Sequence, residues 1–360
     1  MLQLLLMRTA PIVLLAGILS GGAWAETTPR EALLVLSKGD RTIAIVDPST
    51  LKVVGKAPVG EDPHEVIAAA DGKTAYVSNY GFGSYNTLTV IDLVGQKRVS
   101  TIDLGALRGP HGLDFSGGKV WFTAEGAKAI GSYDPAKNVV DWIMGTGQDR
   151  THMIIAAQDG KRIYTTNVSS ASVSVIEKVT RQRRDDKKGP PPAPPGSGAR
   201  PPAGPPATGG MDWQQTVVAV GKGAEGFDVA PGGRELWAAN AQDGTVSIID
   251  VASKKVTATL DVNVPGANRL KFTPDGKLAF VSSLGGAGLV ILDAASRKEV
   301  KRIPMARGAS GMEMQPDGSR VFVSCTGENY VAVVNLKTLE IVARIDAGPQ
   351  PDGLAWAVRP

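Results

Sequence analysis

The sequence predicts an all-β protein, a seven-bladed β-propeller in which each blade is a sheet of four antiparallel strands. One observation is the spacing of a recurring turn, usually Asp-Gly or Gly-Gly before Lys, Arg or Ser. Successive turns lie 42 to 46 residues apart, except for one step of 73. A second observation is that each repeat holds four short apolar segments, which matches the four strands of a blade. The final glycines of these turns are Gly72, Gly118, Gly160, Gly233, Gly276 and Gly318.

The four segments of the first complete repeat show the order of the elements. We expect strands at 64–70, 74–79, 86–93 and 97–105, with the glycine turn between the first two. A four-stranded sheet of this size cannot bury both of its faces alone, so each repeat must pack against its neighbours.

The two ends of the repeat region complement each other. Six complete repeats occupy 62–348, while 31–60 holds three further strands and 350–358 holds one. Together these four strands complete a seventh blade. A ring closed in this way has no exposed sheet edges, which an open stack would leave.

The second-strand phrases carry a family resemblance. The chain has AYVSN at 75–79, IYTTN at 163–167 and the looser LWAAN at 236–240. The protein resembles the YVTN family of β-propeller repeats over nearly the whole chain apart from 181–210. The resemblance implies the fold and leaves the activity open, because related propellers serve as surface proteins, binding modules, lactonases and cofactor-bearing oxidoreductase domains.

The first 25 residues predict a cleaved secretory signal. One arginine precedes an apolar run that is too short for a membrane span and ends in Ala-Trp-Ala. We therefore expect a single propeller at 26–360, without a membrane span, in the periplasm or secreted; a retained N-terminal anchor is the alternative. Cys325 is the single cysteine, so stability must come from a packed core rather than an internal disulfide.

A proline-rich segment at 181–210 interrupts the third complete blade, between its third and fourth strands. It contains nine prolines and predicts a disordered insertion. It serves either as a passive loop or as a tether or polyproline ligand for a partner or the cell wall. Six basic and two acidic side chains lie in it, so most of the formal net charge of +4 resides there. The remaining chain is close to neutral, which argues against nucleic-acid binding.

All three histidines occupy the same repeat position, eight residues before the turn glycine or its equivalent. Side chains two and four residues later are apolar, so this position is the end of the first strand where the core stops. Because first strands line the channel of a propeller, we expect one polar side chain per blade around one channel mouth. These ring residues are His64, His111, His152, Glu225, Asn268, Ser310 and Asp352.

The second strand runs antiparallel to the first, so its final residues are expected at the same mouth. They predict a second, wider polar ring. Its members are Ser37, Asn79, Glu125, Asn167, Asn240, Ser283 and Cys325.

Two interpretations of the ring residues remain open. In the first, each side chain bonds to a loop or an adjacent blade and the channel holds only water. In the second, His64, His111 and His152 converge with Glu225 on a metal such as Zn, Cu or Fe. Arg150 and Arg269 lie beside ring residues, where they could hold a carboxylate or a phosphate.

These patterns predict a monomeric binding or scaffold protein that recognises a small ligand or protein partner at the mouth. Enzymatic activity stays open, although we expect none. The alternative is a metal-dependent lactonase-like hydrolase, or an accessory or cofactor-binding component of a periplasmic oxidoreductase. The sequence has no Cys-x-x-Cys-His haem motif, Gly-rich phosphate loop or Gly-x-Ser-x-Gly motif.

Overall fold

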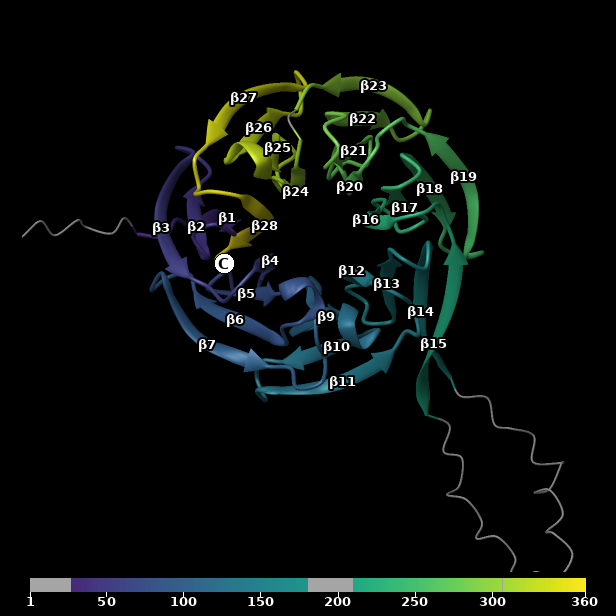
Figure 1. Cartoon of the computed structure of the whole chain (residues 1–360), viewed down its shortest axis with the longest axis horizontal. Helices are drawn as coiled ribbons and strands as arrows, with labels where there is room; N and C mark the ends of the chain where they lie inside the picture. The colour runs from purple at the N-terminus through teal and green to yellow at the C-terminus, as the bar shows by residue number, and fades with distance from the viewer. Residues whose placement is uncertain (1–26, 181–209, 306) are drawn as a thin grey trace, which may run out of the picture.

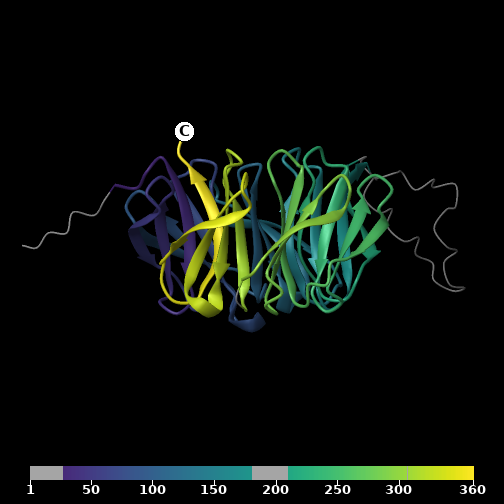
Figure 2. The same ribbon diagram turned by 90° about the horizontal axis from the view of Figure 1, so that it is seen from above.

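The computed structural model describes residues 27–180, 210–305 and 307–360. Seven four-stranded antiparallel sheets surround a central channel (Figure 1), and the ring is a flat disc when seen from its edge (Figure 2). The predicted fold class is therefore confirmed. The expected signal segment, and all of the proline-rich insertion except Gly210, lie outside the described residues.

Three complete blades precede or flank the insertion. The first contains β4 (Pro63–Ala68), β5 (Thr74–Asn79), β6 (Thr87–Asp92) and β7 (Lys97–Asp103). The second contains β8 (Pro110–Ser116), β9 (Lys119–Ala124), β10 (Ala129–Asp134) and β11 (Val139–Gly145). The third contains β12 (Thr151–Ala156), β13 (Arg162–Asn167), β14 (Ser172–Thr180) and β15 (Met211–Ala219).

Three complete blades follow the insertion. The fourth contains β16 (Ala224–Val229), β17 (Glu235–Asn240), β18 (Thr245–Asp250) and β19 (Lys255–Asp261). The fifth contains β20 (Ala267–Phe272), β21 (Leu278–Ser283), β22 (Leu289–Asp293) and β23 (Lys298–Ile303). The sixth contains β24 (Ala309–Met314), β25 (Arg320–Cys325), β26 (Tyr330–Asn335) and β27 (Glu340–Ile345).

The seventh blade combines strands from both ends of the repeat region. It contains β28 (Pro351–Val358), β1 (Glu31–Ser37), β2 (Thr42–Asp47) and β3 (Lys52–Pro58). β28 pairs antiparallel with β1, and Leu33 lies opposite Trp356. Three short 3₁₀ turns, η1 (Gly81–Gly83), η2 (Glu125–Ala127) and η3 (Thr326–Glu328), follow the second strands of their blades.

Apolar side chains pack between neighbouring blades. One cluster joins Leu34 and Ile45 of the seventh blade to Val66 and Val77 of the first. Each blade thus buries the apolar faces of its neighbours, as stacked repeats require. Among the described residues, no helix is long and apolar enough to cross a membrane.

Hydroxyl groups of the second strands clamp the first strand of the next blade. Ser78 donates to the carbonyl of His111 (2.9 Å), Thr123 donates to that of His152 (2.7 Å), and Ser324 donates to that of Asp352 (2.7 Å). These bonds hold the backbone of the ring residues against the preceding blade.

The first strand of every blade bulges at its ring residue. In the first blade Pro63 lies opposite Asn79 and Val66 opposite Val77, so two residues face Ser78 alone. Similar register shifts occur in the other six blades. A bulge of this kind bends the strand and redirects side chains, so the ring residue can turn toward the mouth while the next residue turns into the channel.

Candidate ligand site at the channel mouth

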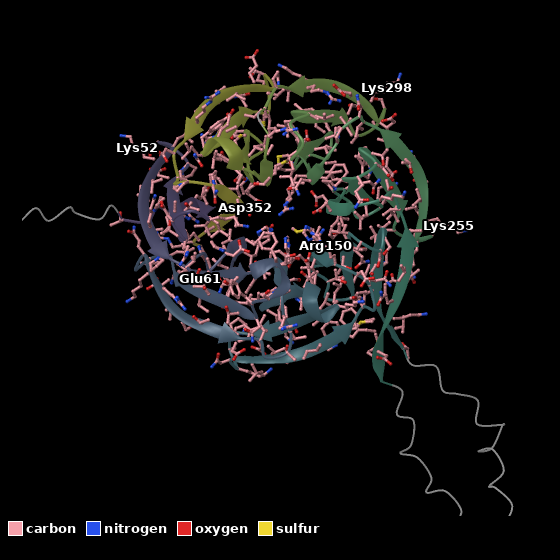
Figure 3. All side chains as sticks on the ribbon, in the orientation of Figure 1. Lys52, Glu61, Arg150, Lys255, Lys298 and Asp352 are labelled. Atoms are coloured by element: carbon pink, nitrogen blue, oxygen red, sulfur yellow. The ribbon has the colours of Figure 1, made fainter. Side chains whose placement is uncertain are left out.

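One cavity of about 490 Å³, the mouth cavity, is lined by every residue that the sequence predicts as ligand-binding. The ring residues come from seven different strands, which the closed ring brings together around its axis. Figure 3 shows Arg150 and Asp352 near the centre of the ring, while Lys52, Lys255 and Lys298 lie at its outer rim. The predicted residues in the cavity are His64, His111, His152, Glu225, Asn268, Ser310, Asp352, Arg150 and Arg269.

The three imidazole rings lie side by side. The ring centroids of His64 and His111 are 4.2 Å apart, and those of His111 and His152 are 3.8 Å apart. Tyr80 follows β5 and packs against this row, with its ring centroid 5.0 Å from that of His64 and 4.9 Å from that of His111. The predicted arc of histidines therefore exists, although its members have very different partners.

His152 is held between two carboxylates. Its Nδ1 lies 2.5 Å from Glu125 Oε1 and its Nε2 lies 2.6 Å from Glu225 Oε2. Burial lowers the pKa of His152, but Glu225 and Glu125 outweigh that effect and raise the pKa to about 9. His152 is therefore an imidazolium at neutral pH, with both ring nitrogens donating. Burial raises the pKa of Glu225, but His152 outweighs it and lowers this pKa to about 2.

His64 belongs to a second ionic cluster. Its Nδ1 lies 3.1 Å from Asp352 Oδ2 and also contacts Lys38 Nζ. Lys38 follows β1 and pairs with both Asp352 (3.0 Å) and Asp62 (3.1 Å). Burial raises the pKa of Asp352, but its interactions with His64 and Lys38 outweigh this and hold the pKa well below its usual range.

His111, between the other two rings, has no partner at either ring nitrogen among the described residues. Only 1% of its surface is exposed. Burial, helped by His152 and His64, lowers the pKa of His111 well below its usual value, so the ring is neutral at pH 7. An unpartnered buried polar group costs about 1–3 kcal/mol, which makes His111 the anomaly of the site.

The remaining predicted side chains are partly paired. Arg269 forms a buried ion pair with Glu65, and its Nη1 also donates to Asn268 Oδ1 (3.4 Å). The hydroxyls of Ser310 and Thr326 lie 2.6 Å apart. Arg150 Nε lies 3.7 Å from Glu125 Oε2 in an ion pair, but the side chain is 45% exposed and lines the cavity, so part of its guanidinium faces a ligand there.

Sequence reasoning missed several residues that line the mouth cavity. The rim carries Phe82, which is 88% exposed, together with Leu284 and Arg307. Arg307 forms no ion pair within the described part of the chain. Lys38 and Tyr80 were missed because they stand one residue beyond the predicted second-strand ends.

The predicted second ring is wrong by one position. β9 ends at Ala124, so Glu125 corresponds to Lys38, Tyr80, Leu284 and Thr326 rather than to the other predicted members. Consecutive strand residues point to opposite sides. A prediction that is wrong by one residue therefore places at the mouth a side chain that actually points into the interior of its blade. None of the predicted members lines the mouth cavity. Ser37, Asn79, Asn167, Asn240, Ser283 and Cys325 are buried within their blades.

The asparagines of that predicted ring have a structural role instead. Asn79 Nδ2 donates to Thr89 Oγ1 (3.1 Å) and Asn240 Nδ2 donates to Ser247 Oγ (2.9 Å). Asn167 makes the same kind of bond to Ser174 (3.0 Å). These amides join the second and third strands of a blade and explain the asparagine at the end of the repeated phrase.

The structure also divides the predicted metal set. Within the described residues, His64, Glu65 and His111 form one group of closely spaced potential ligands, and His111, Glu125 and His152 form another. Glu225 belongs to neither group. The four predicted ligands therefore do not converge on one point, because Glu225 lies against the far nitrogen of His152.

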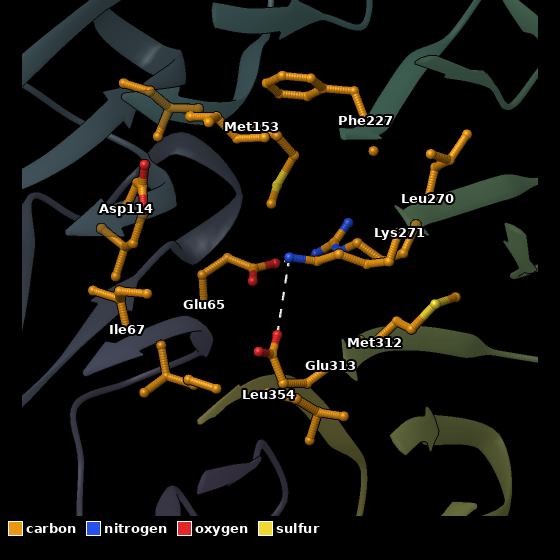
Figure 4. Close-up of a pocket in the computed structure, with 18 of the residues that line it drawn as sticks. Glu65, Ile67, Asp114, Met153, Phe227, Leu270, Lys271, Met312, Glu313 and Leu354 are labelled. Atoms are coloured by element: carbon orange, nitrogen blue, oxygen red, sulfur yellow. Dashed lines mark hydrogen bonds and ion pairs between the residues drawn. The ribbon is translucent and has the colours of Figure 1, made fainter. Parts of the chain in front are cut away.

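Below the mouth the channel interior is also charged. A second cavity of about 170 Å³ is lined by Glu65, Asp114, Lys271 and Glu313 among apolar side chains. Figure 4 shows the ends of Glu65, Lys271 and Glu313 near one another and Asp114 farther away, and Lys271 Nζ lies 3.9 Å from Glu313 Oε2. His64 lines the mouth cavity and the next residue, Glu65, lines this second cavity, so β4 contributes a side chain to each of them.

Comparisons with known proteins support the fold. No protein-family model matches the sequence, and no curated protein sequence matches it. A functionally unknown protein of Desulfotomaculum acetoxidans superposes with a TM-score of 0.69 at 13% identity, covering 91% of this chain and 99% of its own. A Bacteroides uniformis protein, provisionally described as a 6-phosphogluconolactonase, has a TM-score of 0.69 at 14% identity, covering 91% and 100%. The dihydro-heme d1 dehydrogenase NirN has a TM-score of 0.60 at 14% identity, covering 91% and 75%. At these identities the likeness establishes the β-propeller fold alone.

Proposed function

We propose that the protein is an exported YVTN-type propeller that binds a small anionic ligand in the mouth cavity. The observation that carries this proposal is His111, a neutral and buried imidazole that has no partner among the residues that the structure describes. It lies in a cavity lined by polar residues from all seven blades. Natural structures satisfy nearly all of their buried polar groups, so a bound ligand is a reason for such an exception. A cavity of about 490 Å³ also lies within the usual range for small-molecule sites.

The charges and the rim indicate the class of ligand. Arg307 has no ion pair among the described residues, and Arg150 has one long ion pair with Glu125 (3.7 Å). Guanidinium groups bind carboxylates and phosphates well. Phe82 and Leu284 add exposed apolar surface beside them. A small molecule with one carboxylate or phosphate and a flat apolar part therefore fits the cavity best.

A metal-dependent hydrolase is the second candidate. Two groups of histidines and carboxylates that could hold a metal ion favour it, since three such ligands are common in hydrolytic zinc sites. The likeness to the Bacteroides uniformis protein is compatible with this role, and the likeness to NirN is compatible with the oxidoreductase alternative. The proline-rich insertion would serve as a tether or a contact for a partner in each case.

Ligand binding can be tested with phenyl phosphate, benzoate and citrate by calorimetry and thermal unfolding. We expect at least one of them to bind and to raise the melting temperature, because a ligand at 100 times its Kd stabilises the folded state by about 2.7 kcal/mol. A variant with Arg150→Gln and Arg307→Gln should lose this effect. Arg234→Gln, an exposed residue of a turn, is the control. The proposal fails if no probe binds at millimolar concentration, or if the double variant binds as well as the parent.

A further inference from the structure

We propose that His64, Glu65 and His111 bind a divalent transition metal at the floor of the mouth cavity. This inference rests on the same site as the proposed function. It replaces the predicted four-ligand set with three residues from two neighbouring blades. His64 and Glu65 lie on β4 and His111 lies on β8, and their ligand atoms all fall within 4.8 Å of one another. Ligands that surround one ion lie within this range of each other.

His111 is the first argument, because its environment lacks what a structural histidine needs. Neither of its nitrogens has a partner in the described part of the chain, and the residue is 1% exposed. A neutral imidazole keeps a lone pair on one nitrogen, which is the form that binds metals. A metal ion would satisfy that nitrogen without any movement of the strand, whose backbone is held by the bond from Ser78.

His64 is placed as metal-binding histidines usually are. Such a histidine generally donates its second N–H to a carboxylate, which fixes the tautomer and orients the ring. Nδ1 of His64 lies 3.1 Å from Asp352 Oδ2, and Lys38, which also contacts Nδ1, has two carboxylate partners of its own. Metal binding at Nε2 would require the proton on Nδ1, where Asp352 can accept it while Lys38 keeps its ion pairs with Asp62 and Asp352 in place of its contact with Nδ1.

Glu65 supplies the carboxylate. The bulge of β4 turns it into the channel beside His64, and its backbone N–H is fixed by Ser78 Oγ (3.0 Å). Arg269 pairs with Glu65 Oε1 and leaves Oε2 as a ligand atom. Arg269 therefore orients the carboxylate of Glu65 and leaves one of its oxygens for a metal. Metal ligands are commonly supported by a neighbouring side chain in this way.

The competing group of His111, Glu125 and His152 is already saturated. Each nitrogen of His152 bonds a carboxylate, so neither carries a lone pair for a metal. Glu125 also accepts a hydrogen bond from Tyr80. The first group has none of these internal bonds between its own members, and a metal is what would join them.

Two imidazoles and one carboxylate suit Zn²⁺ and Fe²⁺, and such three-residue sets leave coordination positions open. His64 and His111 also line the mouth cavity, so a ligand bound in that cavity would lie beside the metal. A carboxylate or phosphate held by Arg150 and Arg307 could then complete the coordination. The metal would thus extend the recognition of anions to the floor of the cavity.

The test uses untagged full-length protein purified without chelator, analysed for metals and then titrated with Zn²⁺, Co²⁺ and, without oxygen, Fe²⁺. We expect one equivalent to bind, with Co²⁺ giving visible absorption bands. Glu65→Gln and His111→Leu should weaken binding at least 100-fold while circular dichroism stays unchanged. Glu125→Gln, a matched change in the saturated group, should bind as the parent does. The proposal is overturned if the protein binds none of the three ions at 100 μM (about −5.5 kcal/mol), or if Glu125→Gln loses binding while Glu65→Gln keeps it.

A further variant separates the metal from the anion. Arg150→Gln with Arg307→Gln should bind Zn²⁺ like the parent, because neither arginine is a metal ligand. A parent protein that binds Zn²⁺ but none of phenyl phosphate, benzoate and citrate contradicts only the proposed function. Anion binding by a protein that takes up no metal contradicts only the metal site.

Discussion

The first strands carry two sets of polar side chains that differ in their partners. In the channel interior, Asp114 accepts hydrogen bonds from the backbone N–H groups of Phe115 (2.8 Å) and Ala156 (2.7 Å), and Asp228 accepts from Val229 and Phe272 (both 2.9 Å). These carboxylates tie each first strand to the next blade. At the mouth, His111 has no such partner. Polar groups on the same strands can therefore be structural or functional, and their partners distinguish the two.

The largest expected effect comes from removing the partner of two mouth carboxylates. His152→Leu would leave Glu125 and Glu225 buried without the imidazolium between them. Breaking a buried ion pair by removing one member destabilises by about 3–5 kcal/mol. Urea unfolding would measure the loss, with His64→Leu, at a more exposed ring position, for comparison. A loss below about 1 kcal/mol would show that His152 is not the cation that holds this part of the mouth.

Removing an interior carboxylate should have a smaller effect. Asp114→Ala leaves the N–H of Ala156 without its acceptor, and a lost partner of a buried group costs about 1–3 kcal/mol. Asp228→Ala should behave in the same way in the fourth blade. The urea midpoints of both variants check the structural half of the comparison. An unchanged midpoint would mean that these carboxylates, like His111, do not stabilise the fold through their partners.

Replacement of His111 should raise the stability of the protein rather than lower it. His111→Leu replaces an unpartnered polar ring by an apolar side chain, so the metal-free protein should gain about 1 kcal/mol rather than lose stability. The same variant should lose the stabilisation that added Zn²⁺ gives the parent. Thermal unfolding with and without Zn²⁺ tests both statements. A destabilised variant would mean that His111 has a structural partner after all.

The smallest effect is expected at an ion pair on the outside of the ring. Glu177 lies 2.5 Å from Lys254 and 3.1 Å from Arg162, and the bond to Lys254 lowers the pKa of Glu177. A carboxyl with a lowered folded-state pKa stabilises above its unfolded pKa, and this stabilisation is lost as the pH falls through the folded-state value. Glu177→Gln should therefore cost at most about 1 kcal/mol at pH 7 and less at pH 3. Urea unfolding at both pH values gives the comparison; an equal cost at both would exclude a charge effect.

Repeat spacing made the blades and the ring residues predictable, because every blade copies the same strand and the closed ring gathers equivalent positions. Glu125 was misplaced because Ala124, the end of β9, lies one residue closer to its turn glycine, Gly118, than Asn79 lies to Gly72. The sequence also could not predict that His152 is paired with two carboxylates while His111 lacks a partner among the described residues. This difference depends on Glu125 and Glu225, which come from separate blades and whose side-chain directions follow from packing.

The position of Glu65 could also not be predicted from the sequence. Period-two alternation alone would assign it simply to the channel, and the bulge at its position has no clear signature in PHEVIA. Hydroxyls such as Ser78 and Thr123 recur in the second-strand phrases and could have indicated the clamps. Their bonds to the following blade become evident only once neighbouring blades are placed.

The pairing of β28 with β1 also sets the order in which the mouth can be completed. β28 carries Asp352, the carboxylate that orients His64, although the two residues are separated by almost the entire propeller. A growing chain therefore holds six blades before the seventh can close and before His64 acquires its acceptor. The mouth cavity is therefore complete only in the finished ring, and a chain that stopped before β28 would lack Asp352 and with it one wall of the cavity.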